Sequence, residues 1–81
     1  MNFGKAIEAL KDGKKVARSG WNGKGMYLFL CFPAYIKPKA ENVEIYSARQ
    51  SIAIRTADSS IVVGWNASQE DMLSEDWMIV E

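Results

Sequence analysis

Histidine is absent from the 81-residue chain, which also contains a single cysteine and two prolines. Without histidine, the chain cannot build a Ser-His-Asp triad, a Cys-His pair or an ordinary zinc site. A lone cysteine, Cys31, excludes an intramolecular disulfide and fits a reducing compartment, where we expect it to be a small core residue. These absences argue against the common forms of catalysis, and nothing in the composition calls for a metal ion or a cofactor.

Long hydrophobic runs are also absent. The longest, Met26 to Phe32, has seven residues, whereas a membrane-spanning helix needs about twenty. The N-terminal residues mix charged and apolar types, which is not the pattern of a signal peptide. We therefore expect a soluble, cytoplasmic protein with no membrane partner.

Apolar side chains are nevertheless abundant for a chain of this size. Hydrophobic residues make up 48% of the sequence and include three Trp, three Tyr and three Phe. A chain this short forms one domain, residues 1–81, and buries only about 60% of the surface that its unfolded form exposes. The excess of apolar material predicts a homo-oligomer.

The formal net charge is zero, which argues against general nucleic-acid binding. The charges are unevenly spread, however. Residues 1–40 hold eight basic and two acidic side chains, and residues 41–81 hold two basic and eight acidic ones. Two interpretations stay open: the basic half attracts phosphate groups, or the two halves pair with each other within or between subunits.

The residue pattern predicts an α+β fold. Asn2 is suited to cap a helix that ends at Gly13. The apolar face of this helix comprises Phe3, Ala6, Ile7 and Leu10. Strands are predicted over residues 15–18, 26–32, 51–56, 61–63 and 77–80. A capping box of Ser68 and Asp71 predicts a short helix before the last strand. We expect the first helix to pack on a twisted, mainly antiparallel sheet of about five strands.

Two loops each place a Trp-Asn pair beside a glycine. Residues 19–25 read SGWNGKG, and residues 64–71 read GWNASQED. Glycines allow a ligand to approach the backbone, and a flat indole with an adjacent amide suits a nucleobase and its polar edge. The paired residues are Trp21 with Asn22 and Trp65 with Asn66. The loops thus predict a site that holds a base between two rings, although each loop alone also fits a turn whose tryptophan folds into the core.

Three cations are candidates for a pyrophosphate, because phosphates favour charge-assisted donors: Arg18, Lys24 and Arg55. Arg55 lies on the strand face away from Ile52 and Ile54, where it points either to solvent or into a site. The acidic pairs at 70–71 and 75–76 could be compared with a glycosidase dyad, but acids are also expected near a helix N-terminus. No activated nucleophile accompanies them, so the residues favour binding over catalysis.

Two long segments resemble the Thoeris anti-defence two family, which comprises small phage and bacterial domains. They are MNFGKAIEALKDGKKVARSGWNGKGMYLFL and IAIRTADSSIVVGWNASQEDMLSEDWMIV, and only Cys31 to Ser51 falls outside the resemblance. The resemblance implies a homotetrameric sponge of the host cytoplasm that binds glyco-cyclic ADP-ribose, the signal of Thoeris immune proteins, without cutting it. Some relatives also bind cyclic di- or trinucleotides. The implied pocket positions are Trp21, Asn22, Trp65, Asn66, Ser68 and Asp71.

Two further hypotheses use the same residues. A single-strand RNA-binding module would use the tryptophans for stacking and would show steep salt dependence. A purely structural oligomerisation domain would use them to join subunits and would bind no small molecule.

Overall fold

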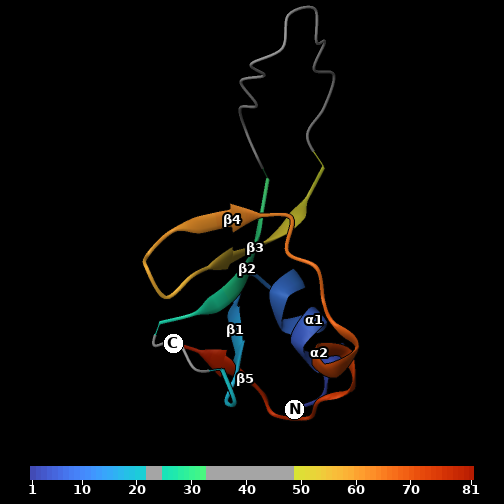
Figure 1. The fold of residues 1–81 in the computed structure, drawn as a ribbon. Coiled ribbons are helices and arrows are strands. Elements are labelled where there is room, and N and C mark those ends of the chain that lie inside the picture. The colour runs from blue at the N-terminus through green and yellow to red at the C-terminus, as the bar shows by residue number, and fades with distance from the viewer. Residues whose placement is uncertain (22–24, 33–48) are drawn as a thin grey trace, which may run out of the picture.

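The computed structural model describes residues 1–21, 25–32 and 49–81. Its elements are α1 (Phe3–Lys11), β1 (Lys15–Arg18), β2 (Tyr27–Cys31), β3 (Ser51–Arg55), β4 (Ile61–Val63), α2 (Gln69–Leu73) and β5 (Trp77–Val80). The strands form one sheet in the order β4-β3-β2-β1-β5, and every neighbouring pair is antiparallel (Figure 1). The predicted α+β fold is confirmed, including the short helix before the last strand.

The first helix begins and ends where the sequence predicts. The Asn2 side chain accepts a hydrogen bond from the Lys5 backbone N–H at 2.9 Å, which satisfies one of the free donors of the first turn. Gly13 follows the C-cap residue Asp12 and has φ of +82°, a conformation that a glycine adopts without steric cost. The two ends together limit α1 to nine residues.

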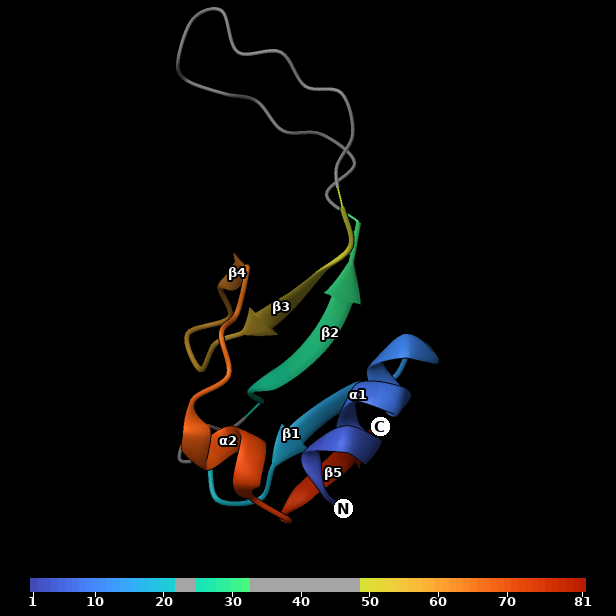
Figure 2. The ribbon, with the colours of Figure 1, turned by 90° about the vertical axis from the view of Figure 1, so that its right-hand side faces the viewer.

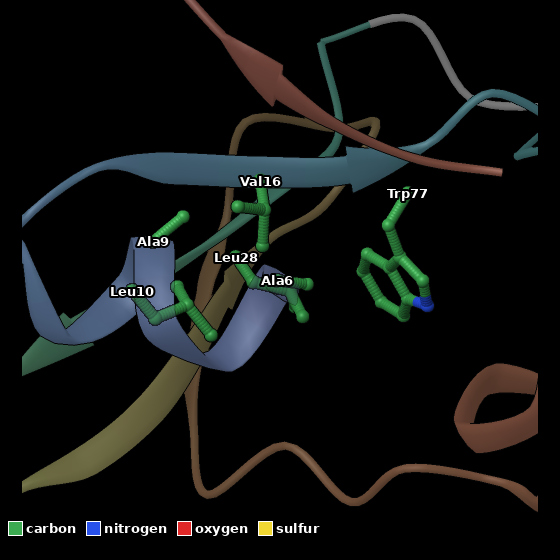
Figure 3. Packing of buried hydrophobic residues seen from close by; sticks show 6 residues of the cluster. All are labelled: Ala6, Ala9, Leu10, Val16, Leu28 and Trp77. Carbon is green, nitrogen blue, oxygen red and sulfur yellow. The ribbon is translucent and has the colours of Figure 1, made fainter. Parts of the chain in front are cut away.

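The core lies between α1 and one face of the sheet. Figure 3 shows Ala6, Ala9 and Leu10 of the helix facing Val16 and Leu28 of the central strands. Phe3 and Ile7 are only partly buried, whereas Ala9 lies at the contact with the sheet, so the buried stripe of α1 is centred slightly away from the predicted one. Burial of each large core side chain contributes on the order of 1.5–3 kcal/mol.

The two helices lie next to each other beside β1 and β5, while β4 extends away from both (Figure 2). Val16, Leu28 and Ile54 lie side by side on neighbouring strands, and their side chains point toward α1. Among the described residues, neither helix packs on the other face. The residues that alternate with Leu28 along β2 point to that face, and among them Tyr27 and Phe29 are half-buried.

The strand β2 is central in the sheet, and its two faces differ. Leu28 is fully buried against α1, and the alternate residues are only half-buried. Within a single chain, therefore, α1 covers only the face of β2 that carries Leu28. Neither α1 nor α2 is long and apolar enough to cross a membrane, and no other helix occurs in the described residues.

Candidate functional site

Three tryptophans meet beside the two helices. Trp21 follows β1, Trp65 follows β4, and Trp77 begins β5. The ring centroids of Trp21 and Trp65 are 6.5 Å apart, and those of Trp21 and Trp77 are 5.5 Å apart. Trp77 is 2% exposed, whereas the other two rings are only partly buried. The structure thus brings the two predicted loop tryptophans together over a buried third ring.

Within one chain the two loop rings are not parallel. Trp21 and Trp65 are inclined at 63°, in an edge contact. A base can be held between two rings only if they are nearly parallel and separated by two stacking distances. Within one chain, therefore, Trp21 and Trp65 form an aromatic corner, and a base can stack on one ring while it contacts the edge of the other.

The capping box predicted at the start of α2 is present. The Ser68 Oγ accepts a hydrogen bond from the Asp71 N–H, and the Asp71 Oδ2 accepts one from the Ser68 N–H, both at 3.0 Å. The Asp71 carbonyl also accepts a hydrogen bond from the Trp77 Nε1 at 2.9 Å. Ser68 and Asp71 therefore fix the loop that carries Trp65, and Asn66 in the same loop is exposed.

Arg18 lies among three acidic side chains. Its Nε donates to Asp76 at 2.9 Å, its Nη1 donates to Asp71 at 3.0 Å, and its Nη2 lies 3.5 Å from Glu70. The hydrogen bonds to Asp76 and Asp71 raise the pKa of the guanidinium further above its ordinary value. Three carboxylates already surround this one positive charge. A phosphate group in the predicted position would therefore have to compete with them for Arg18.

The two aspartates in this cluster are held in the ionised form. Hydrogen bonds from Arg18 and from the Gly20 N–H lower the pKa of Asp76. Burial acts to raise the pKa of Asp71, but hydrogen bonds from Ser68 and Arg18 outweigh it, so that its pKa is also lowered. A glycosidase-type general acid requires a raised pKa, so the pKa shifts of Asp71 and Asp76 run opposite to that requirement.

Asp76 is a residue of the site that the sequence reasoning missed. Its Oδ2 accepts hydrogen bonds from the Gly20 N–H at 3.1 Å and from the Ser19 hydroxyl at 3.4 Å, and its carbonyl accepts one from the Ser19 N–H at 3.0 Å. Asp76 thus holds the start of the loop that carries Trp21. The available signal was the position of Arg18 and Asp76 at the ends of two strands, but only the pairing of β1 with β5 shows that these ends are adjacent.

Arg55 lies on the other face of the sheet, as predicted from the alternation in its strand. Its Nη1 donates to the Gly25 carbonyl at 2.6 Å, and its Nη2 donates to the Ser59 hydroxyl at 2.9 Å. The Tyr27 ring lies between this guanidinium and the Lys15 ammonium, at 6.0 and 4.9 Å from its centroid. The structure therefore does not bring Arg55 to the tryptophan cluster.

The remaining predicted site residues, Asn22 and Lys24, lie outside the described residues. A hollow of about 510 Å³ lies elsewhere on the surface, between the turn after α1 and the end of β5. None of the predicted site residues lines it. Its lining residues are Gly13, Lys14, Lys15, Ile79, Val80 and Glu81.

Comparison with known proteins identifies the family to which the chain belongs. The model of the Thoeris anti-defense 2-like domain matches residues 1–80. The protein named Thoeris anti-defense 2 of Bacillus phage SP01 is 44% identical, and the match covers 99% of this chain and 94% of that relative. The match is longer than the sequence motifs indicated, because it runs through residues 31–51. The chain therefore belongs to the Thoeris anti-defense 2-like family, which supports an anti-defence role for it.

Proposed function

We propose that the chain counters Thoeris defence by binding and sequestering a cyclic nucleotide signal, glyco-cyclic ADP-ribose, without cutting it. The observation that carries the proposal is the meeting of Trp21 and Trp65 from two separate loops. Both rings are partly accessible and both rest on the buried Trp77. A rigid aromatic corner of this kind offers a stacking surface whose conformational cost is paid during folding.

The aromatic corner gives a nucleobase one ring to stack on and a second ring edge to contact. Such stacking contributes about 1–3 kcal/mol per base. The loop of Trp65 also carries Asn66 and leads into the start of α2, and amide and backbone groups of this kind are suited to the polar edge of a base. In this proposal Ser68 and Asp71 serve the site by holding that loop in place.

The phosphate groups need positive charge from another source than Arg18, whose guanidinium is surrounded by carboxylates. Lys24 is the remaining predicted cation in the first tryptophan loop. A neighbouring subunit is a second source of positive charge. Arg55 and Lys15 lie on the open face of the sheet, which is the face opposite to α1. We therefore assign the pyrophosphate to Lys24, with cations of a second subunit completing the pocket.

A second copy of the chain is the proposed partner, and the family resemblance implies a tetramer. Besides these cations, the open sheet face carries apolar side chains, and Phe29, Val63 and Met78 are at least partly exposed within one chain. A corner formed by two inclined rings also needs a facing wall to enclose a ligand. Assembly of subunits supplies this wall and covers the apolar face.

Catalysis plays no part in the proposed mechanism. A sponge requires only that the ground state of the ligand is bound tightly and released slowly. The lowered pKa values of Asp71 and Asp76 fit residues that hold an ion-pair network and not residues that donate protons.

Calorimetric titration with glyco-cyclic ADP-ribose tests the proposal, followed by heating of the complex and chemical analysis of the released compound. We expect binding and recovery of intact ligand. Trp65→Ala should weaken binding by about 1–3 kcal/mol, or roughly 5- to 150-fold, because a stacking surface is lost. Trp65→Phe should retain part of the affinity, and Phe32→Ala, which removes an exposed aromatic outside the cluster, should bind as the unaltered protein does.

Two outcomes would redirect the proposal. A chemically altered product would revive an enzymatic role. Absence of both heat and a thermal shift would exclude this ligand. The same titration with cyclic di- and trinucleotides and with single-stranded RNA would then separate the remaining hypotheses.

A further inference from the structure

We infer that Arg18 and Asp76 are positioning residues that hold the two tryptophan loops in one fixed arrangement and do not contact the nucleotide. The inference rests on the proposed function, because it names how the same site is kept in shape. Asp76 thereby gains a role in the site, and Arg18 holds the two loops in place of contacting the pyrophosphate.

Asp76 holds the start of the loop that carries Trp21. Because Arg18 pairs with Trp77 across β1 and β5, Asp76 lies directly beside the residues that follow Arg18. The Asp76 carboxylate accepts a hydrogen bond from the Gly20 N–H, and the Asp76 main-chain carbonyl accepts one from the Ser19 N–H. The Trp21 N–H donates to the Arg18 carbonyl at 3.2 Å. A Cβ on Gly20 would meet the Asp76 Oδ2 at 3.1 Å, so the carboxylate sits tightly against this backbone.

Arg18 holds the end of the loop that carries Trp65. The Arg18 Nη1 donates to the Asp71 Oδ1, while the Oδ2 of the same carboxylate closes the capping box with Ser68. Ser68 lies three residues after Trp65. A displacement of Arg18 would therefore release α2 and, with it, the end of the loop that sets the position of Trp65.

One guanidinium thus joins both loops through two carboxylates. Asp76 binds the start of the Trp21 loop, and Asp71 binds the end of the Trp65 loop. The planar fork of arginine can hold two such groups at once, whereas lysine offers a single point charge. The buried Trp77 completes the connection, because its Nε1 donates to the Asp71 carbonyl while its ring contacts both other indoles.

The surroundings of Arg18 argue against direct contact with a phosphate. Its side chain is 12% exposed, and each of its three nitrogens faces a carboxylate. One positive and three negative charges leave an excess of negative charge at this point. A phosphate group would be repelled from this cluster unless two of its acids moved away.

The test combines Arg18→Lys, Arg18→Gln, Asp76→Asn and the double variant of Arg18→Gln with Asp76→Asn. Each single change should weaken nucleotide binding about tenfold, equivalent to ~1.4 kcal/mol. The double variant should be weaker than either single variant but by less than the product of their two effects, because the residues share one ion pair while Arg18 also holds Asp71 and Asp76 also holds the Gly20 N–H. Near-ultraviolet circular dichroism of the free protein should change in parallel, since the signal of the indoles depends on their mutual arrangement.

A phosphate-contacting Arg18 gives a different pattern. In that case Arg18→Gln would weaken binding without altering the near-ultraviolet spectrum, and Asp76→Asn would strengthen binding by freeing the guanidinium. Either result would overturn the inference. Lys5→Gln is the matched control, because it breaks the exposed ion pair with Glu8 on α1 and should change neither readout.

The spectroscopic readout separates this inference from the proposed function. If the unaltered protein binds no nucleotide, the proposed function fails, while an unchanged near-ultraviolet spectrum in the variants would refute the positioning role on its own. Should Arg18→Gln not fold, Arg18→Lys and Asp76→Asn retain the comparison, because each keeps a polar partner in place.

Discussion

At the scale of single residues, the ion-pair cluster of Arg18 with Asp71 and Asp76 has the clearest energetic signature. Both aspartates have a pKa below the ordinary value of 3.8 because they accept hydrogen bonds from Arg18 and from nearby backbone or side-chain groups. A carboxyl group whose pKa is lower in the folded than in the unfolded chain stabilises the fold above the unfolded value. That stability is lost as the pH falls through the lowered folded value.

We therefore predict a fall in the melting temperature as the pH is lowered below about 3.8. The Asp76→Asn variant should be less stable at neutral pH and should lose less stability on acidification, because it has one such group fewer. Thermal unfolding followed by circular dichroism between pH 2 and pH 7 measures both effects. Parallel pH profiles for the two proteins would contradict the assignment.

The partners of Arg18 were beyond the reach of the sequence. Its acids lie more than fifty residues away along the chain, and their proximity depends on the pairing of β1 with β5. The sequence did identify Arg18 as a residue of the site and assigned it to a ligand. Spacing alone cannot tell whether an arginine faces a ligand or a carboxylate of its own chain, because both offer the same acceptor oxygens.

At the scale of elements, α2 depends on its cap more than on a buried face. It has only five residues, none of them buried, and isolated helices of this length are unstable in water. The reciprocal hydrogen bonds of Ser68 and Asp71 satisfy two of its free donors. Contacts with Arg18 and Trp77 then fix the position of the helix against the sheet.

Ser68→Ala should lower the free energy of unfolding by about 1 kcal/mol, the usual cost of an N-cap. Ser68→Asn keeps an acceptor oxygen and should retain most of the stability. Urea denaturation monitored by circular dichroism gives both values. Equal midpoints for Ser68→Ala and the unaltered protein would show that the capping box contributes nothing to the fold.

Local signals made most elements predictable. The sequence correctly predicted the limits of α1 at Asn2 and Gly13, the capping box, and the strands β1, β4 and β5. These features were predictable because caps, left-handed glycines and alternation depend on only a few neighbouring residues. The angle between Trp21 and Trp65 was not predictable. It follows from the sheet order and from the packing of both rings on Trp77, which no short pattern encodes.

At the scale of the whole molecule, the two sheet faces are unequal. Among the described residues, α1 packs on one face, whereas the other presents aromatic and aliphatic side chains with Lys15 and Arg55 among them. A small domain with 48% hydrophobic residues cannot bury all of them by itself. The proposed assembly of several copies resolves this imbalance if it uses the open face.

Two neighbouring valines of β4 test this arrangement with equal exposure. Val63 is in register with Ala53 on the open face, and Val62 is in register with Ile54 on the face of α1, yet both are 51% exposed. Val63→Lys should shift the sedimentation coefficient toward that of a single chain, because burial of a charge opposes assembly. Val62→Lys should leave the assembly intact, and dissociation of both variants to the same degree would argue against the open face.

The clustering of the tryptophans also determines the intrinsic fluorescence of this protein. All three tryptophans of the chain lie in one cluster, with ring centroids within 6.5 Å of each other. Excitation energy absorbed by any one of them passes readily to the others, so the intrinsic emission comes from a single place. A molecule that stacks in the aromatic corner would thus alter the emission of the whole chain, and its arrival and departure could be timed by stopped flow without an attached dye.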